Sequence, residues 1–199
     1  SHILYDVINR DEKIFCERVY APAVDMENMM REKNIPLFAL ESREPITNFD
    51  VIAFTLQYEL SYTNILNMLD LANVPILRTE RKLDDPFILV GGPCAYNVEP
   101  MADFVDIVVL GEGEEVNLEI LNAYKEWKKN KTTREDFLYQ ISSIEGVYIP
   151  SFYDVTYNED NTVKEVVPNR ENIPSKPHKR IIKDVENVPY PEKLIVPFI

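Results

Sequence analysis

Three short apolar runs, separated by longer stretches, most constrain what this chain can fold into. The runs lie at 51–56, 87–90 and 105–110. Nearly continuous apolar runs of this length, the third with one acidic residue, are typical of strands buried on both faces of a parallel sheet. Apolar residues recur at helical spacing after the first run, at 61–72, and after the third, at 114–129. The alternation predicts an α/β fold with an open, mostly parallel, doubly wound sheet that carries helices on both faces.

Further elements are expected around these runs. Helical spacing predicts helices at 3–8, 25–33 and 133–141, and β-branched and aromatic residues predict strands at 14–20 and 37–40. Because a domain rarely opens on a helix, we expect that a first strand is missing from the start of the chain. The pattern is Rossmann-like or flavodoxin-like.

The character of the sequence changes after Glu145. Residues 146–150 resemble a strand, and so do 152–157 and 162–167, which flank the turn-forming sequence Asn-Glu-Asp-Asn. The last two strands are therefore predicted to form a β-hairpin.

Prolines recur from residue 168 to the end of the chain, with one further strand candidate at 179–183. Such a tail is typical of an extended connector that lies over another surface. We predict a Rossmann-like domain at 1–144, followed at 145–199 by a hairpin extension and a linker.

The acidic composition argues against nucleic acid as a partner. The net charge is −13, with 34 acidic and 21 basic residues, whereas a protein that binds a duplex must neutralise phosphates with Lys and Arg. The lysines within 125–131 are interpreted as a solvated helix end, where cations complement the helix dipole.

No apolar run approaches the ~20 residues of a membrane-spanning helix, and no secretion signal is recognised. We therefore expect a cytoplasmic protein without a membrane partner. The two cysteines, Cys16 and Cys94, fit a reducing compartment. They are too few for a three- or four-cysteine cluster, so no metal site is expected in this segment.

Ligands of open α/β sheets bind beyond the carboxyl ends of the strands. The segments 55–59, 91–95 and 111–115 occupy such positions, and four of the five glycines lie in the last two. Glycine lets a backbone approach a ligand closely, which predicts a ligand edge, although tight turns alone also use glycine. Cys94 is either a small packing residue, the interpretation that we favour, or a reactive thiol.

Several chemistries find no support. The acidic third segment is a poor phosphate cradle, and neither Gly-x-Gly-x-x-Gly nor a Walker loop occurs. His2 and His178 lie near the ends of the chain, and no Gly-x-Ser-x-Gly elbow accompanies them. Residues 57–59 are either polar ligand contacts or helix-cap residues. An α/β enzyme that uses Glu59 or Glu112 as its acid–base group is the weakest alternative, and no catalytic residue is assigned.

Residues 88–95, 99–100 and 105–114 together resemble the cobalamin-binding-type domain that precedes many radical S-adenosylmethionine enzymes. The segments 16–22 and 54–64 are similar to one uncharacterised branch of those proteins. The resemblance covers nearly the whole chain, with the Gly-Gly-Pro and Gly-Glu-Gly-Glu elements in order.

The resemblance implies that cobalamin lies at the ligand edge of this domain. The classical Asp-x-His-x-x-Gly motif, whose His replaces the lower base on cobalt, does not occur, so the cofactor would bind without it. The candidate cofactor-binding residues, all near strand ends, are Thr55, Leu56, Gln57, Gly91, Gly92, Pro93, Gly111 and Glu112.

The resemblance also implies that 179–180 and 190–191 lead into a radical core whose Cys-x-x-x-Cys-x-x-Cys motif holds a 4Fe-4S cluster and S-adenosylmethionine. That motif does not occur in these residues. We therefore expect an Fe-S oxidoreductase whose accessory N-terminal domain positions cobalamin or caps the radical core of the same polypeptide, inactive alone. The alternative is a cofactor-free interaction or scaffold domain that keeps the fold.

Overall fold

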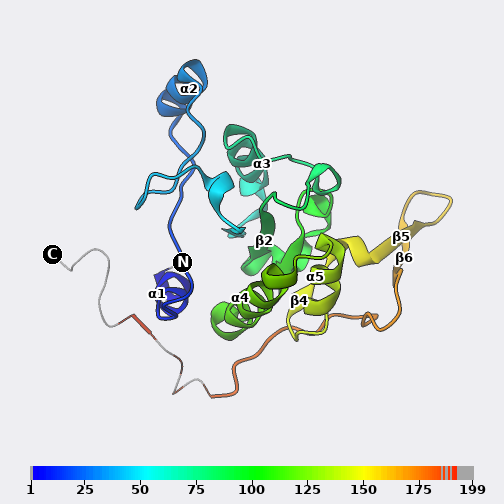
Figure 1. Cartoon of the computed structure of the whole chain (residues 1–199). Helices are drawn as coiled ribbons and strands as arrows, with labels where there is room; N and C mark the ends of the chain where they lie inside the picture. Colours follow the sequence, from blue (N-terminus) through cyan, green and yellow to red (C-terminus); the bar gives the residue numbers. More distant parts are fainter. Residues whose placement is uncertain (1, 185, 187, 189, 192–199) are drawn as a thin grey trace.

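The computed structural model describes residues 2–184, 186, 188, 190 and 191. A four-stranded sheet lies between helices, and a two-stranded hairpin extends from one side (Figure 1). The strands of the main sheet, in spatial order, are β1 (Val51–Thr55), β2 (Phe87–Gly91), β3 (Ile107–Val109) and β4 (Val147–Tyr148). The first three are parallel and β4 is antiparallel, which confirms the predicted α/β class with a mostly parallel sheet.

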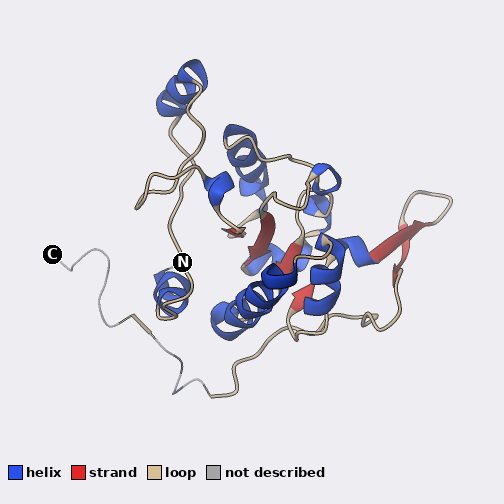
Figure 2. Ribbon diagram, in the orientation of Figure 1, coloured by secondary structure: helices blue, strands red, loops and turns tan. Residues whose placement is uncertain are grey.

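Alternate residues of the strands pack on opposite faces, as the pleat of a strand requires. One face packs against α3 (Tyr62–Leu71), and the other against α4 (Gly113–Asn130) and α5 (Arg134–Ile141). Figure 2 shows these helices on either side of the strands. The strand residues on the α3 face include Ile52, Ile88, Val90 and Val108, and those on the α4 face include Phe87, Leu89, Ile107 and Val109.

The α4 face is built around an aromatic cluster. Phe87 of β2 meets Tyr124 and Trp127 of α4 edge-on, and its ring centroid lies 4.8 Å from that of Phe137 in α5. Aromatic pairs at such spacing add about 0.5–1.5 kcal/mol each beyond the burial of their area. This cluster fixes α4 and α5 on the sheet.

Helical spacing predicted most helices correctly, including α1 (His2–Asn9) and α2 (Val24–Lys33). The start of α5 carries a capping box, in which Thr133 Oγ1 accepts from the Asp136 N–H and the Asp136 carboxylate accepts from the Thr133 N–H. Ser61 occupies the N-cap position of α3 without a side-chain capping bond, because its hydroxyl donates to the Tyr58 carbonyl at the preceding 3-10 turn Glu59–Ser61.

The strands predicted at 14–20 and 37–40 are wrong. Residues 14–20 run as an extended trace between α1 and α2 (Figure 1), but the Cys16 backbone is paired with the side chain of Asn9 rather than with a strand. Phe38 forms only an isolated bridge with Pro45. Strand propensity describes fit to a half-buried pleated surface, and no described strand lies beside these segments to supply that surface.

The hairpin predicted after residue 150 is confirmed as β5 (Tyr153–Tyr157) and β6 (Val163–Pro168). β4 lies beyond residue 145 and pairs with β3, so the segment 145–199 contributes to the main sheet. The division of the chain at 144/145 stays a prediction, and residues 192–199 of the predicted tail lie outside the described residues. No helix among the described residues is long and apolar enough to cross a membrane.

Candidate functional site

The carboxyl ends of β1 and β2 are bonded to each other through their loops. The Leu56 N–H donates to the Gly91 carbonyl at 2.7 Å, and the Cys94 N–H donates to the Leu56 carbonyl at 3.1 Å. The Leu56 side chain is fully buried, whereas Thr55, Gln57 and Pro93 are exposed. The structure thus brings the predicted residues of the first two strand ends together, with Leu56 turned into the core.

Gly92 is required by the chain's own packing. Its φ is +107°, and a Cβ at this position would lie 2.9 Å from the Leu56 carbonyl oxygen and 3.1 Å from Thr55 Cγ2. A left-handed φ combined with so close a backbone approach favours glycine whether or not a ligand is present. The Cβ side of Gly92 is therefore occupied by the loop after β1.

Gly111, at φ +95°, is covered in the same way by the tail of the chain. The Arg180 N–H donates to the Leu110 carbonyl at 2.8 Å, and the Glu112 N–H donates to the Arg180 carbonyl at 3.2 Å. This parallel bridge places the Arg180 backbone where a Cβ of residue 111 would stand. The strand predicted at 179–183 does not form; Arg180 makes only an isolated parallel bridge with Gly111, just beyond the carboxyl end of β3.

The acidic residues at the start of α4 bind this tail segment. The Ile182 N–H donates to the Glu112 carboxylate, and the Arg180 guanidinium lies 2.7 Å from Glu115 and 2.6 Å from Glu119. The hydrogen bond to Glu115 is the main reason that the pKa of Arg180 lies above its ordinary value. The acidity of this segment, predicted as part of a ligand edge, is used within the chain.

An uncovered surface remains at the ends of β1 and β2. Three large side chains from the loops after these strands are exposed: Tyr58 by 55%, Leu60 by 81% and Tyr96 by 61%. Single exposed apolar residues are common, but three on adjoining loops, bordered by Gln57, indicate an interaction surface. Tyr58 and Gln57 were candidates from the sequence, whereas Leu60, Tyr96 and the covering role of Arg180 were missed.

Cys94 is not set up as a nucleophile. Desolvation raises the pKa of its thiol, and the nearby Glu59 carboxylate raises it further. A thiol with a raised pKa carries little thiolate at neutral pH, which is the reactive form. Its backbone is structural, because the Cys94 carbonyl accepts from the Tyr62 hydroxyl.

The residues at the strand ends offer little fit to cobalamin. At Gly92 and Gly111, the two positions with the closest backbone approach, the space is filled by Leu56 and Arg180. In the part of the chain that the structure describes, no group of three or more His, Cys, Asp or Glu residues could hold a metal ion. Neither glycine therefore supports the predicted corrin contact, and cobalamin binding stays a prediction.

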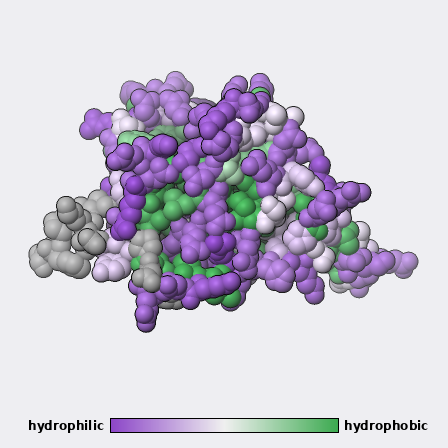
Figure 3. Space-filling model, turned by 60° about the horizontal axis from the view of Figure 1, so that its bottom comes forward, coloured by the Kyte–Doolittle hydropathy of each residue, from purple (hydrophilic) through white to green (hydrophobic). Residues whose placement is uncertain are grey.

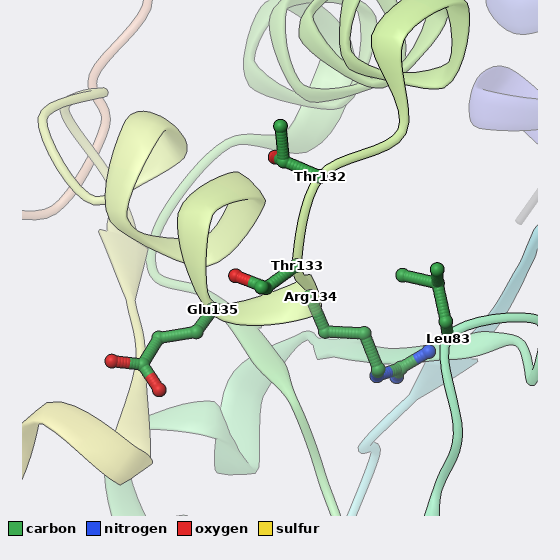
Figure 4. Close-up of a pocket in the computed structure, with 5 residues that line it drawn as sticks. All are labelled: Leu83, Thr132, Thr133, Arg134 and Glu135. Carbon is green, nitrogen blue, oxygen red and sulfur yellow. The ribbon is translucent and has the colours of Figure 1, made fainter.

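The two cavities that stand out lie away from this edge. One, of about 370 Å³, is lined by Leu83 and residues 132–135 (Figure 4). Arg134 at its wall binds the carbonyl of Pro86, just before β2, so the cavity lies at the opposite, amino end of the sheet. The other, of about 320 Å³, lies around Lys128, which is paired with Asp50 ahead of β1. Neither includes a predicted site residue.

The structure defines an α/β domain in which glycines follow the parallel strands β2 and β3 at their carboxyl edge. Residues 1–150 match the family of N-terminal domains of radical SAM proteins, and the chain belongs to this family. It is similar to the uncharacterized protein MJ0966 of Methanocaldococcus jannaschii, with 35% identity over 143 residues, which are 61% of this chain and 30% of that protein. The chain therefore spans less than a third of that relative. No solved structure matches the chain.

Proposed function

We propose that this domain caps the radical core of its own polypeptide with the carboxyl edge of its sheet. In a radical SAM protein that core would hold the 4Fe-4S cluster and S-adenosylmethionine, which generate a radical that water and oxygen must not reach. The domain itself supplies no catalytic group in this proposal. Its contribution is to close the core against solvent.

The observation that carries the proposal is the exposed apolar surface formed by Tyr58, Leu60 and Tyr96 beside the strand ends. Aromatic residues are enriched in the buried centres of protein interfaces, where charged residues are depleted. The Arg180 segment, bonded to the same edge at β3, supports this orientation, because it holds the tail against the carboxyl ends of the strands.

The narrower role, in which the domain also positions cobalamin, rests on a different observation. Thr55 and Gln57 present polar side chains at the exposed end of β1, where they could contact a bound corrin's amide groups. The family match supports the accessory domain, and the contact with cobalamin is proposed from these residues alone.

The capping proposal is tested in the full-length protein with its cluster reconstituted under anaerobic conditions. Leu60→Glu places a charge in the proposed interface, and Met29→Glu, at an equally apolar exposed residue of α2, is the matched control. The measurement is the rate at which a chelator with an oxidant bleaches the cluster's visible absorption. We expect a several-fold faster loss for L60E and an unchanged rate for M29E.

Equal bleaching rates for L60E, M29E and the unmodified protein would contradict the capping role. Equilibrium dialysis of the full-length protein against hydroxocobalamin tests the narrower role separately. Binding that is weakened by Gln57→Ala and Thr55→Ala would support it, and no binding at high micromolar cobalamin would exclude it. If the capping test succeeds and cobalamin does not bind, the domain caps the core without a cofactor of its own.

A further inference from the structure

β1 is one of the two edge strands of the main sheet, and its outer edge has no partner strand among the described residues. Among the described residues β1 pairs only with β2. The Leu56 N–H and the Asp50 carbonyl point toward β2, so the N–H and C=O groups of Val51, Ala53 and Thr55 point away from it, because backbone groups alternate sides along a strand. Unpaired edges of apolar strands are templates for another strand.

The side chains on one face of β1 are also uncovered. Ala53 and Thr55 are exposed, whereas Leu89, the register partner of Ala53 in β2, is buried under α4. Figure 3, turned so that the side of α1 and α4 comes forward, shows apolar surface between polar margins. The bare stretch of β1 therefore lies on the same face of the sheet as α4.

α1 lies on this face and runs in the direction of a crossover helix. Its Leu4 packs against Gly113 at the carboxyl edge, and past its end Asp11 pairs with Lys125 of α4 at 2.9 Å. α1 is thus parallel to α4 and antiparallel to the strands. A strand that leads into α1 must end at the carboxyl edge, which makes it parallel to β1.

The right-handedness of crossover connections determines on which side of β1 a strand before α1 would lie. The connections from β1 to β2 and from β2 to β3 pass over the α3 face and lead across the sheet in one direction. A right-handed crossover over the opposite face, where α1 lies, leads in the reverse direction. A strand that led into α1 would therefore stand beside β1, with the segment after α1, residues 14–20, on its far side.

Residues 14–20 have the properties of a strand but no partner strand among the described residues. The backbone groups of Cys16 and Arg18 on one side of the segment bond to Asn9, Glu41 and Leu40. The segment is extended, rich in β-branched and aromatic residues, and Phe15 is 74% exposed. Val19 packs against the buried cluster on the α3 face, here called the α3-side core, so the segment borders the sheet on that face. An inserted strand would pair with these residues on one side and with β1 on the other.

We propose that an apolar strand from the part of the full-length polypeptide outside these 199 residues inserts between β1 and residues 14–20, parallel to β1. The similar protein MJ0966 has more than two thirds of its length outside the matched region, so such chain exists in a relative. The inserted strand has apolar residues on both faces, because one faces α1 and the other faces the α3-side core. This proposal is independent of the capping function.

Hydrogen exchange of the full-length protein tests the insertion. The peptide 51–56 carries the inward amides of Ile52, Phe54 and Leu56 and the outward amides of Val51, Ala53 and Thr55. With the inserted strand we expect both sets to exchange slowly, independent of protein concentration. Rapid exchange of the outward set would overturn the proposal. So would protection that is lost on dilution, because β1 would then pair with a second copy of the chain.

A substitution gives a second readout in the same protein. Ala53→Lys adds a charge that the inserted strand and α1 would bury, whereas Val163→Lys adds one on β6, where residue 163 is 58% exposed. We expect A53K to lower the Tm by about 5–10 °C and V163K to leave it within about 2 °C. Equal, small shifts for both variants would show that the face of β1 is open and would overturn the proposal.

Discussion

Asp106→Asn tests whether one buried carboxylate holds the amino end of the sheet together. Asp106 directly precedes β3, and its Oδ2 accepts from the Ile88 N–H at 2.7 Å and from Arg81 Nη1 at 2.8 Å, with Arg134 Nη2 at 3.2 Å. The side chains of Arg81 and Asp106 are 0% and 4% exposed. Burial is the main reason that the pKa of Arg81 lies below its ordinary value, and the Asp106 charge opposes that shift.

The loss of unfolding free energy depends on which hydrogen-bond partners remain after the substitution. Asparagine keeps the shape and can still accept from the Ile88 N–H, so the change isolates the loss of charge. Removing one partner of a buried ion pair costs about 3–5 kcal/mol. Arg81 keeps three carbonyl acceptors, at Pro75, Ile76 and Phe104, so we expect a cost near 3 kcal/mol. For a chain of this size that is a Tm shift of roughly 6–12 °C.

Urea unfolding, followed through the fluorescence of Trp127, measures this cost. Trp127 is the only tryptophan of the chain and is buried in the aromatic cluster on the α4 face. Asp103→Asn, at an exposed carboxylate three residues away, is the matched control and should change stability by less than about 0.5 kcal/mol. A loss below 1 kcal/mol for D106N at an unchanged m-value would refute the reasoning, because the two arginines would then need no buried counter-charge.

Three further predictions concern other features of the fold. Gly92→Ala should lower the free energy of unfolding in urea by about 1–3 kcal/mol. Gly91→Ala, whose Cβ would meet only ordinary contacts at 3.5 Å, should lower it clearly less. Equal losses for the two variants would contradict the close packing at Gly92. Desolvation raises the pKa of Cys16 to about 11, so in native protein at pH 8 it should be alkylated about 100-fold more slowly than a free thiol, and equal rates would contradict its burial. Hydrogen bonds from Thr133 lower the pKa of Asp136. The capping box therefore stabilises α5 fully above the ordinary carboxyl pKa near 4, and this stabilisation is lost as the pH falls through the lowered pKa. Thr133→Ala should lower the free energy of unfolding by about 1 kcal/mol at pH 7 and by less at pH 3.

The central sheet could be predicted because its signals are local. The runs at β1, β2 and β3 are apolar without interruption, and α4 carries Val116, Ile120, Tyr124 and Trp127 at helical spacing. Such patterns depend only on which faces are buried. Residues 14–20 also carry a local strand signal, in their β-branched and aromatic residues, but have no partner strand among the described residues, and pairing is not a local property.

The candidate site was harder to predict because its contacts are distant in sequence. Glu112 and Ile182 are separated by 70 residues, and no periodicity links the tail to the start of α4. The sequence placed Gly92 and Gly111 correctly near strand ends. What lies against them, the Leu56 carbonyl and the Arg180 backbone, depends on the path of the whole chain.

The two ends of the sheet therefore differ in what they can do. At the amino end, Asp106 forms buried ion pairs with Arg81 and Arg134 that hold the loops together. Such a network resists rearrangement, because breaking it leaves a buried charge unpaired. At the carboxyl end, the Arg180 segment is held by backbone hydrogen bonds and by half-exposed ion pairs, which are individually weak. The tail can thus leave Gly111 at far lower cost than the amino end can open. If the domain caps a radical core as we propose, any adjustment to that core is expected at Gly111 and Arg180.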